Sequence, residues 1–227
     1  MSEFNPEVID QPEARRAMRL ASCASVTVAL ILIVAKTSAW LTTGSVAVLS
    51  SLVDSLLDAI ASVVTLVAIQ HSLQPADHEH RFGHGKVEAL AAMAQSAFIL
   101  GSAVLLLFEA GARALDPRPI EKGEIGIYVM LFSIGLTISL VMFQRWAIAK
   151  SGSIAISADS LHYQGDLLLN TAVIAAILMV SELGWVMADP IFGTAIALYI
   201  IWSAYRIVRN SLDMLMDREL PDTEREK

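Results

Sequence analysis

Two pairs of side chains with metal-binding chemistry lie inside long apolar segments of the chain. Asp54 and Asp58 are four residues apart, and so are His162 and Asp166. This spacing puts both members of a pair on one face of an α-helix. If the two helices face each other, they present three carboxylates and one imidazole, and clustered carboxylates repel one another unless a cation lies between them. We therefore predict that these four residues form a metal site.

The ligand set indicates which metals the site would bind. Four nitrogen and oxygen ligands suit a tetrahedral Zn²⁺ site. Mg²⁺ and Ca²⁺ prefer shells made of oxygen alone, whereas imidazole suits zinc and other transition metals. Zn²⁺ is the first expectation, and Fe²⁺ or Cd²⁺ is the alternative. Two interpretations without a metal stay open: buried hydrogen-bonded residues that fix helix packing, and a proton relay.

The apolar segments predict an all-α, polytopic membrane protein with six transmembrane helices. The chain has 227 residues, of which 55% are hydrophobic and 17% are charged, whereas soluble domains carry about 25% charged residues. A span needs about 20 apolar residues, and runs this long exclude the short alternating strands of a barrel. The expected spans are residues 17–41, 45–71, 87–115, 123–148, 154–183 and about 190–208.

The basic residues predict how these spans are oriented. Most of the 16 Lys and Arg residues lie at the N-terminus, in the second and fourth connections, or at the C-terminus. An excess of Lys and Arg marks the cytoplasmic side, so both termini are expected to be cytoplasmic. We predict a cytoplasmic tail at residues 1–16 and a transmembrane domain at residues 17–212. Residues 213–227 are predicted to be the start of a linker to a cytoplasmic domain. The absence of any other basic patch argues against nucleic acid as a partner.

The connection between the second and third spans, residues 74–85, is polar and rich in histidine. Asp77, His80 and His84 are predicted to form a second, three-ligand metal site in this cytoplasmic loop. Short histidine-rich tracts commonly bind metal, although the inference is compositional and an ordinary solvated loop is the alternative. His71 and His78 are weaker candidates in the same region.

Asp159 and Lys36 are two other charged residues within the predicted spans that need an explanation. A charged side chain at the bilayer centre costs at least about 2.5–3.5 kcal/mol, so such residues need a partner or a function. Asp159 lies near the cytoplasmic start of the fifth span, where we expect it to stabilise the helix N-terminus. Lys36 is expected to reach an interface or to pair with a carboxylate.

Three segments resemble the cation diffusion facilitator family. Residues 44–58, with the motif Asp-xxx-Asp, resemble its second helix, and residues 158–166, with His-xxx-Asp, resemble its fifth. Residues 72–86 are similar to the zinc and iron efflux branch of its bacterial members. The resemblance extends from about residue 15 to residue 221. It implies a homodimer in the bacterial inner membrane that exchanges Zn²⁺, or a similar cation, for H⁺.

The resemblance also assigns roles to particular residues. It implies that the transport site consists of Asp54, Asp58, His162 and Asp166, and that the loop site consists of Asp77, His80 and His84. It further implies that Lys86 pairs with Asp217, just past the sixth helix. Members usually continue into a cytoplasmic metal-binding domain, which we expect this chain to lack.

Two other classes of protein would also place metal ligands in a membrane. A membrane metalloenzyme usually keeps three protein ligands and an open position for water, whereas four ligands are available here and no separate general base stands out. A channel builds rings of ligands from several subunits and binds its ions weakly. The paired motifs favour a transporter over both.

Overall fold

The computed structural model describes residues 11–44, 46–115, 124–185 and 187–216. These residues form six helices: α2 (Pro12–Thr43), α3 (Val46–Ser72), α4 (Lys86–Leu115), α5 (Glu124–Ser151), α6 (Ile154–Leu183) and α7 (Ala188–Leu215). All six are long and apolar enough to cross a membrane. The prediction of an all-α protein with six transmembrane helices is confirmed.

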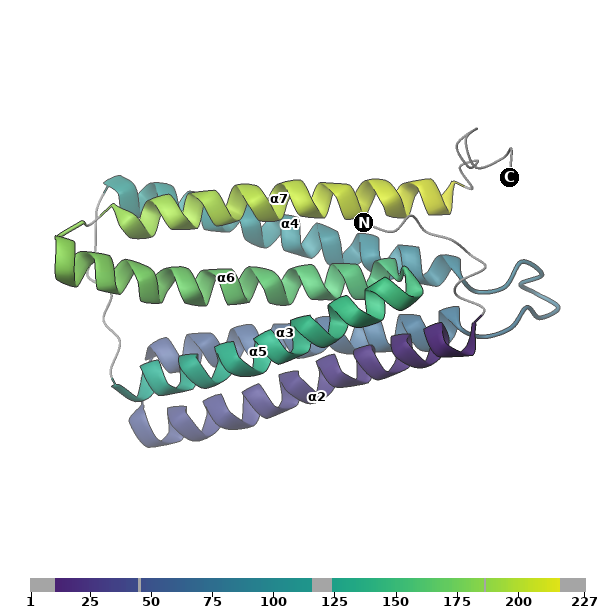
Figure 1. The fold of residues 1–227 in the computed structure, drawn as a ribbon, viewed down its shortest axis with the longest axis horizontal. Helices are drawn as coiled ribbons and strands as arrows, with labels where there is room; N and C mark the ends of the chain where they lie inside the picture. Colours follow the sequence, from purple (N-terminus) through teal and green to yellow (C-terminus); the bar gives the residue numbers. More distant parts are fainter. Residues whose placement is uncertain (1–10, 45, 116–123, 186, 217–227) are drawn as a thin grey trace.

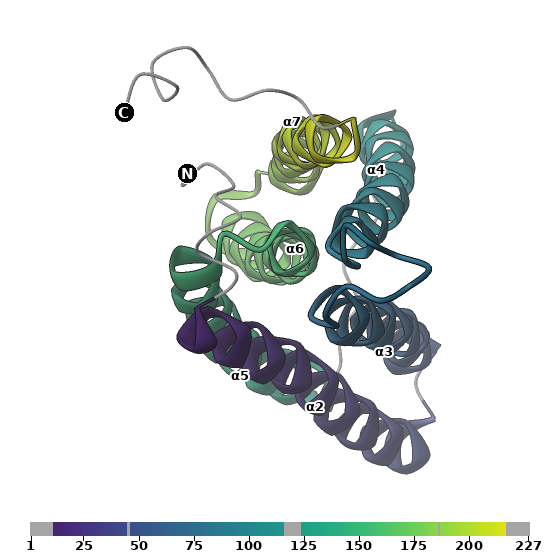
Figure 2. The ribbon, with the colours of Figure 1, turned by 90° about the vertical axis from the view of Figure 1, so that its right-hand side faces the viewer.

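The six helices run side by side along one axis, and their connections lie at its two ends (Figure 1). The first turn of α2, the last turn of α7 and the loop between α3 and α4 lie at the same end. Figure 2 looks along the bundle from that end and shows α6 near its centre, and α6 packs against each of the other five helices. Side chains on α6 therefore meet partners from every part of the bundle.

Small side chains fill the contacts between helices, and large apolar side chains point outward. Ala92, Ala158 and Ala204 are fully buried in one cluster of α4, α6 and α7. Val34 and Phe108, by contrast, are largely exposed. Helices in a bilayer associate through close packing of small residues because lipid is as apolar as leucine. The distribution of side-chain sizes agrees with a bundle surrounded by lipid.

Two contacts fix the position of α6. At its N-terminus, the Ser153 side chain accepts a hydrogen bond from Ile156 N, and Oε1 of the buried Glu88 on α4 accepts bonds from Ser153 Oγ and Ala155 N. Farther along, a Cβ added at Gly165 would lie 3.1 Å from Ile200 Cδ1 on α7. Glycine therefore allows α6 and α7 to approach closely next to the predicted metal ligands.

Candidate metal sites

Three of the four predicted ligands of the intramembrane site come together between α3 and α6. Asp58, His162 and Asp166 each offer one ligand atom, and these atoms lie within 4.8 Å of one another. His162 Nε2 is 2.7 Å from Asp58 Oδ1 and 3.9 Å from Asp166 Oδ2. Ligand atoms around a tetrahedral zinc lie roughly 3.4 Å apart, given Zn–N and Zn–O distances near 2.1 Å. Small side-chain movements would therefore form a zinc shell.

A proton and a metal would use the same atoms at the short contact between Asp58 and His162. An N···O distance of 2.7 Å is a hydrogen bond, so one proton lies between the carboxylate and the imidazole. A metal needs the deprotonated carboxylate and the neutral ring nitrogen. Metal binding at these atoms must therefore displace that proton.

Asp54, the fourth predicted ligand, lies outside this group. It is exposed and sits one turn before Asp58 on α3, whereas Asp58 is buried. The i, i+4 spacing puts Asp54 and Asp58 on the same side of α3. Of these two carboxylates, Asp58 is the one that contacts His162. Asp166 is also the more open of the α6 ligands, with 36% of its side chain exposed against 11% for His162.

The expected role of Asp159 at a helix N-terminus is wrong. Ser153 caps α6, and Asp159 lies more than one turn farther along the helix and is 1% exposed. Its carboxylate accepts hydrogen bonds from three other helices: Gln144 Nε2 at 2.7 Å, Gln95 Nε2 at 3.2 Å and Ser62 Oγ at 3.4 Å. A carboxylate buried this deeply needs several donors to replace water, and the bundle supplies them.

The two glutamines of this network, Gln95 and Gln144, are not among the residues predicted from the sequence. Gln144 on α5 also donates to Ser25 Oγ on α2, and Thr65 on α3 donates to Gln95 Oε1 on α4. The network thus joins α2, α3, α4, α5 and α6 one turn before His162. A large polar amide inside an apolar span is a signal that could have identified both residues.

Lys36 extends from α2 toward α3, close to the candidate metal ligands. Its Nζ donates to Ser55 Oγ at 2.6 Å and to Ser51 O at 3.1 Å, both on α3. It also lies within electrostatic range of Asp54, Asp58 and Asp166. The lysine therefore adds positive charge beside the three carboxylates without a direct ion pair to them among the contacts that the structure describes.

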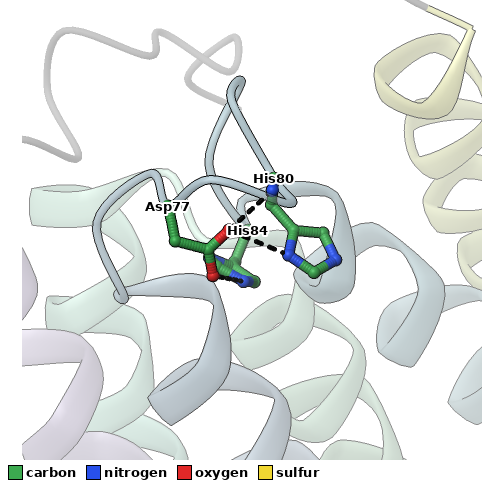
Figure 3. Close-up of side chains that lie close together, drawn as sticks. All are labelled: Asp77, His80 and His84. Carbon is green, nitrogen blue, oxygen red and sulfur yellow. Dashed lines mark hydrogen bonds and ion pairs between the residues drawn. The ribbon is translucent and has the colours of Figure 1, made fainter.

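The loop between α3 and α4 brings all three residues of the second predicted site together. Figure 3 shows Asp77, His80 and His84 turned toward one another, and their ligand atoms lie within 4.8 Å. His80 Nδ1 is 3.2 Å from Asp77 Oδ1, and His84 Nε2 is 3.6 Å from Asp77 Oδ2. The second distance exceeds a hydrogen bond but is close to the ~3.4 Å between neighbouring ligands of zinc. His71 and His78 lie outside this group.

The backbone holds Asp77 in its ionised form. The Asp77 carboxylate accepts hydrogen bonds from His80 N at 2.6 Å and from Glu79 N at 3.0 Å. The backbone bond from His80 is the main reason that the pKa of Asp77 lies below its ordinary value, and the His80 side chain and Glu79 N–H add to the effect. Because ligands must be deprotonated to bind metal, Asp77 is ready to bind well below neutral pH.

We expect His80→Ala and His84→Ala to remove zinc binding at the loop, whereas His78→Ala should retain it. Each of the first two changes removes a predicted ligand, while His78 is an exposed neighbour outside the group. Isothermal titration with Zn²⁺ should therefore lose one binding event per chain in the first two variants. Binding by the unaltered loop should weaken in acidic solution, because protons compete with Zn²⁺ for the ligand atoms. Equal zinc binding by all three variants would exclude this site.

One member of the predicted pair of Lys86 and Asp217, namely Asp217, lies outside the described residues. Lys86 is the first residue of α4, and its Nζ donates to Leu215 O at 3.4 Å, the last residue of α7. Lys86 therefore does reach the end of α7 where the partner was predicted. The pair itself stays a prediction.

Known proteins are similar to this chain over most of its length. The family model described as "Cation efflux transmembrane domain" matches residues 22–216. A cation-efflux pump FieF from Shewanella oneidensis is 49% identical over 210 residues, which is 92% of this chain and 71% of that protein. Proteins of the same name from Pectobacterium atrosepticum (47% over 213 residues, 94% of this chain and 71% of that protein) and Citrobacter koseri (45% over 219, 96% and 72%) are similar.

Proposed function

Because this chain belongs to the cation efflux family, we propose that it exports divalent metal cations, Zn²⁺ foremost, from the cytoplasm in exchange for protons. It is a multi-pass transporter of the bacterial inner membrane rather than an enzyme. We propose Zn²⁺ as the main metal, protons as the coupled ion, and residues 17–212 as the domain that carries the cation-binding residues.

One observation carries the proposal: ligands from two helices converge in the interior of a membrane bundle. Asp58 on α3 and both His162 and Asp166 on α6 offer oxygen and nitrogen atoms within 4.8 Å of one another. Ionisable groups inside a membrane are expensive and mark ion pathways. The imidazole favours Zn²⁺ over Mg²⁺ and Ca²⁺ and leaves Fe²⁺ and Cd²⁺ as alternatives.

Proton exchange follows from the chemistry of the same atoms. The proton shared by Asp58 and His162 occupies the positions that a metal would use. A metal that enters from the cytoplasm releases protons, and protons that enter from the opposite side release the metal. A proton gradient directed inward then drives metal outward.

Alternating access requires the site to open to each side in turn. We propose that Asp54 completes the shell as a fourth ligand when α3 and α6 shift against each other. Asp54 is exposed and one turn from Asp58, so a small rotation of α3 brings it toward the cation. Lys36 stabilises the three carboxylates electrostatically while no metal is bound.

The loop site and the dimer complete the proposal. The loop joins α3 to α4, and α4 holds the N-terminus of α6 through Glu88. A metal bound by Asp77, His80 and His84 would stiffen this connection and bias the movement of α6. By resemblance to the family, we propose that the transporter works as a homodimer.

We expect inside-out vesicles that contain this protein to accumulate Zn²⁺ when their interior is acidic. The cytoplasmic face is then outside, so metal enters and protons leave down their gradient. Uptake should saturate with zinc concentration, and a protonophore that collapses the gradient should stop net accumulation. Internal pH, read with a trapped dye, should rise as zinc enters.

Two controls make this experiment decisive. Vesicles without the protein should show no uptake, and vesicles with the protein but no pH gradient should only equilibrate zinc. A flux that does not saturate and ignores the gradient would indicate a channel. Accumulation that persists after the gradient is collapsed would contradict proton exchange.

A further inference from the structure

A groove on the outer surface of the bundle lies apart from both metal sites. α6 forms its floor with Gln164, Leu167 and Leu168, and α5 and α7 form its walls. Its volume is about 500 Å³, within the range of roughly 300–1,000 Å³ that small-molecule pockets occupy. Exposed side chains such as Met142 line it, so it opens toward the lipid.

The groove changes from polar to apolar along its length. At one end, Arg145 Nη2 on α5 donates to Gln164 Oε1 on α6 at 3.1 Å. Toward the other end, α5 contributes Met142, Val141 and Ile138, successively farther from Arg145. A helix rises 1.5 Å per residue, so Ile138 lies about 10 Å deeper than Arg145. This order of groups matches a molecule with a charged head and an apolar tail.

The charged end lies near the cytoplasmic interface. α5 has 28 residues, which corresponds to about 42 Å and exceeds the ~30 Å hydrocarbon layer. If α5 is centred, about 6 Å of helix protrudes at each end. Arg145 is six residues before Ser151, the cytoplasmic end of α5, or about 9 Å inside it. The Cα of Arg145 is therefore about 3 Å inside the hydrocarbon layer, from where its long side chain can extend to the phosphates of the inner leaflet.

We propose that this groove binds one anionic phospholipid of the inner leaflet, with its phosphate on Arg145 and an acyl chain along α5, α6 and α7. A guanidinium has five N–H donors, more than the bond to Gln164 uses, and binds phosphate in a bidentate way. Basic pockets between transmembrane helices on the cytoplasmic side are the sites where anionic headgroups bind. A zwitterionic lipid would place a second positive charge beside Arg145.

The position of the groove links the lipid to the transport helix. Gln164, Leu167 and Leu168 lie on the same turns of α6 as Asp166, which faces the metal site. A lipid in the groove supports this part of α6 from the side opposite α3. The lipid site itself does not depend on the proposed transport function, because lipid binding is measured without metal.

Native mass spectrometry of the full chain in detergent tests the proposal. Phosphatidylglycerol and phosphatidylcholine with identical acyl chains are the probes. We expect the unaltered protein to retain phosphatidylglycerol more strongly. Arg145→Ala should weaken phosphatidylglycerol binding about tenfold, the scale of one charge-assisted hydrogen bond, and should leave phosphatidylcholine binding unchanged. Arg145→Lys should keep part of the preference, and Met142→Trp, which fills the groove, should weaken binding of both lipids.

Lys150→Ala is the matched control. Lys150 is also a basic residue on α5, but it pairs with Glu13 Oε2 at 3.1 Å and lies outside the groove. This variant should bind phosphatidylglycerol like the unaltered protein. The proposal would be overturned if Arg145→Ala and Lys150→Ala lost phosphatidylglycerol binding equally. It would also be overturned if Arg145→Ala had no effect on lipid binding, or if Met142→Trp had none. Competition by soluble glycerol phosphate as effective as by the lipid would reassign Arg145 to a soluble anion.

Discussion

Asp58→Asn is expected to abolish measurable zinc transport while leaving the fold intact. Asparagine has the shape of aspartate, and its Oδ1 still accepts a hydrogen bond from the His162 ring, which lies 2.7 Å from Asp58 Oδ1. The substitution removes the negative charge and the anionic ligand. Zinc uptake into inside-out vesicles with an acidic interior measures the effect.

The size of the effect follows from the free energy that each ligand contributes. Four-ligand zinc sites bind with apparent free energies of roughly 10–16 kcal/mol, so one ligand corresponds to about 3 kcal/mol, or about a hundredfold in affinity. Asp58 also shares with His162 the hydrogen bond whose proton must leave when zinc binds. The substitution therefore removes the anionic ligand that replaces this proton interaction with a bond to zinc.

Asp189→Asn is the matched control for this change. Asp189 forms an ion pair with Arg113 at 2.9 Å where α7 begins, far along the chain from the metal ligands. We expect transport close to that of the unaltered protein, because an ion pair of this kind contributes little. If Asp58→Asn transports zinc normally, the assignment of the transport site is wrong. If Asp54→Asn alone transports normally, the shell has three protein ligands and Asp54 is not the fourth.

Asp159→Ala is expected to destabilise the protein strongly. Asp159 accepts hydrogen bonds from Gln95, Gln144 and Ser62 on three different helices. Interhelical hydrogen bonds in membranes contribute about 0.6 kcal/mol each on average, but alanine would also leave buried donors unpaired, at about 1–3 kcal/mol each. We expect the free energy of unfolding to fall by about 3 kcal/mol, measured by denaturant unfolding in detergent with circular dichroism.

Asp159→Asn should cost less than Asp159→Ala. The asparagine amide would face the Gln144 Nε2 group, which creates a repulsive donor pair. Gln144 Oε1 is buried and has no hydrogen-bond partner in the part of the chain that the structure describes. Rotation of the Gln144 amide by 180° would therefore turn this free acceptor toward the new donor. Ser139→Ala, at an exposed serine bonded within its own helix, is the neutral control, and an Asp159→Ala protein as stable as this control would contradict the role of the network.

The sequence by itself determined the six helices and the pairs of candidate metal ligands on them. Helix periodicity and the thickness of a bilayer are local constraints, so apolar run length predicted the spans. The i, i+4 spacing placed His162 with Asp166 on one face of a helix. The loop group of Asp77, His80 and His84 was also predictable, because these residues are close in the chain and a short loop keeps them close in space.

Only the tertiary structure decided which side chains meet across helices. The rotation of one helix against another depends on packing, such as the approach of Gly165 to Ile200, and spacing within a single helix does not encode it. For this reason Asp58, rather than Asp54, contacts His162. Asp159 was expected at a helix end because local position was the only guide. Its actual partners come from α3, α4 and α5, up to 97 residues away in the chain, and only the assembled bundle brings them together.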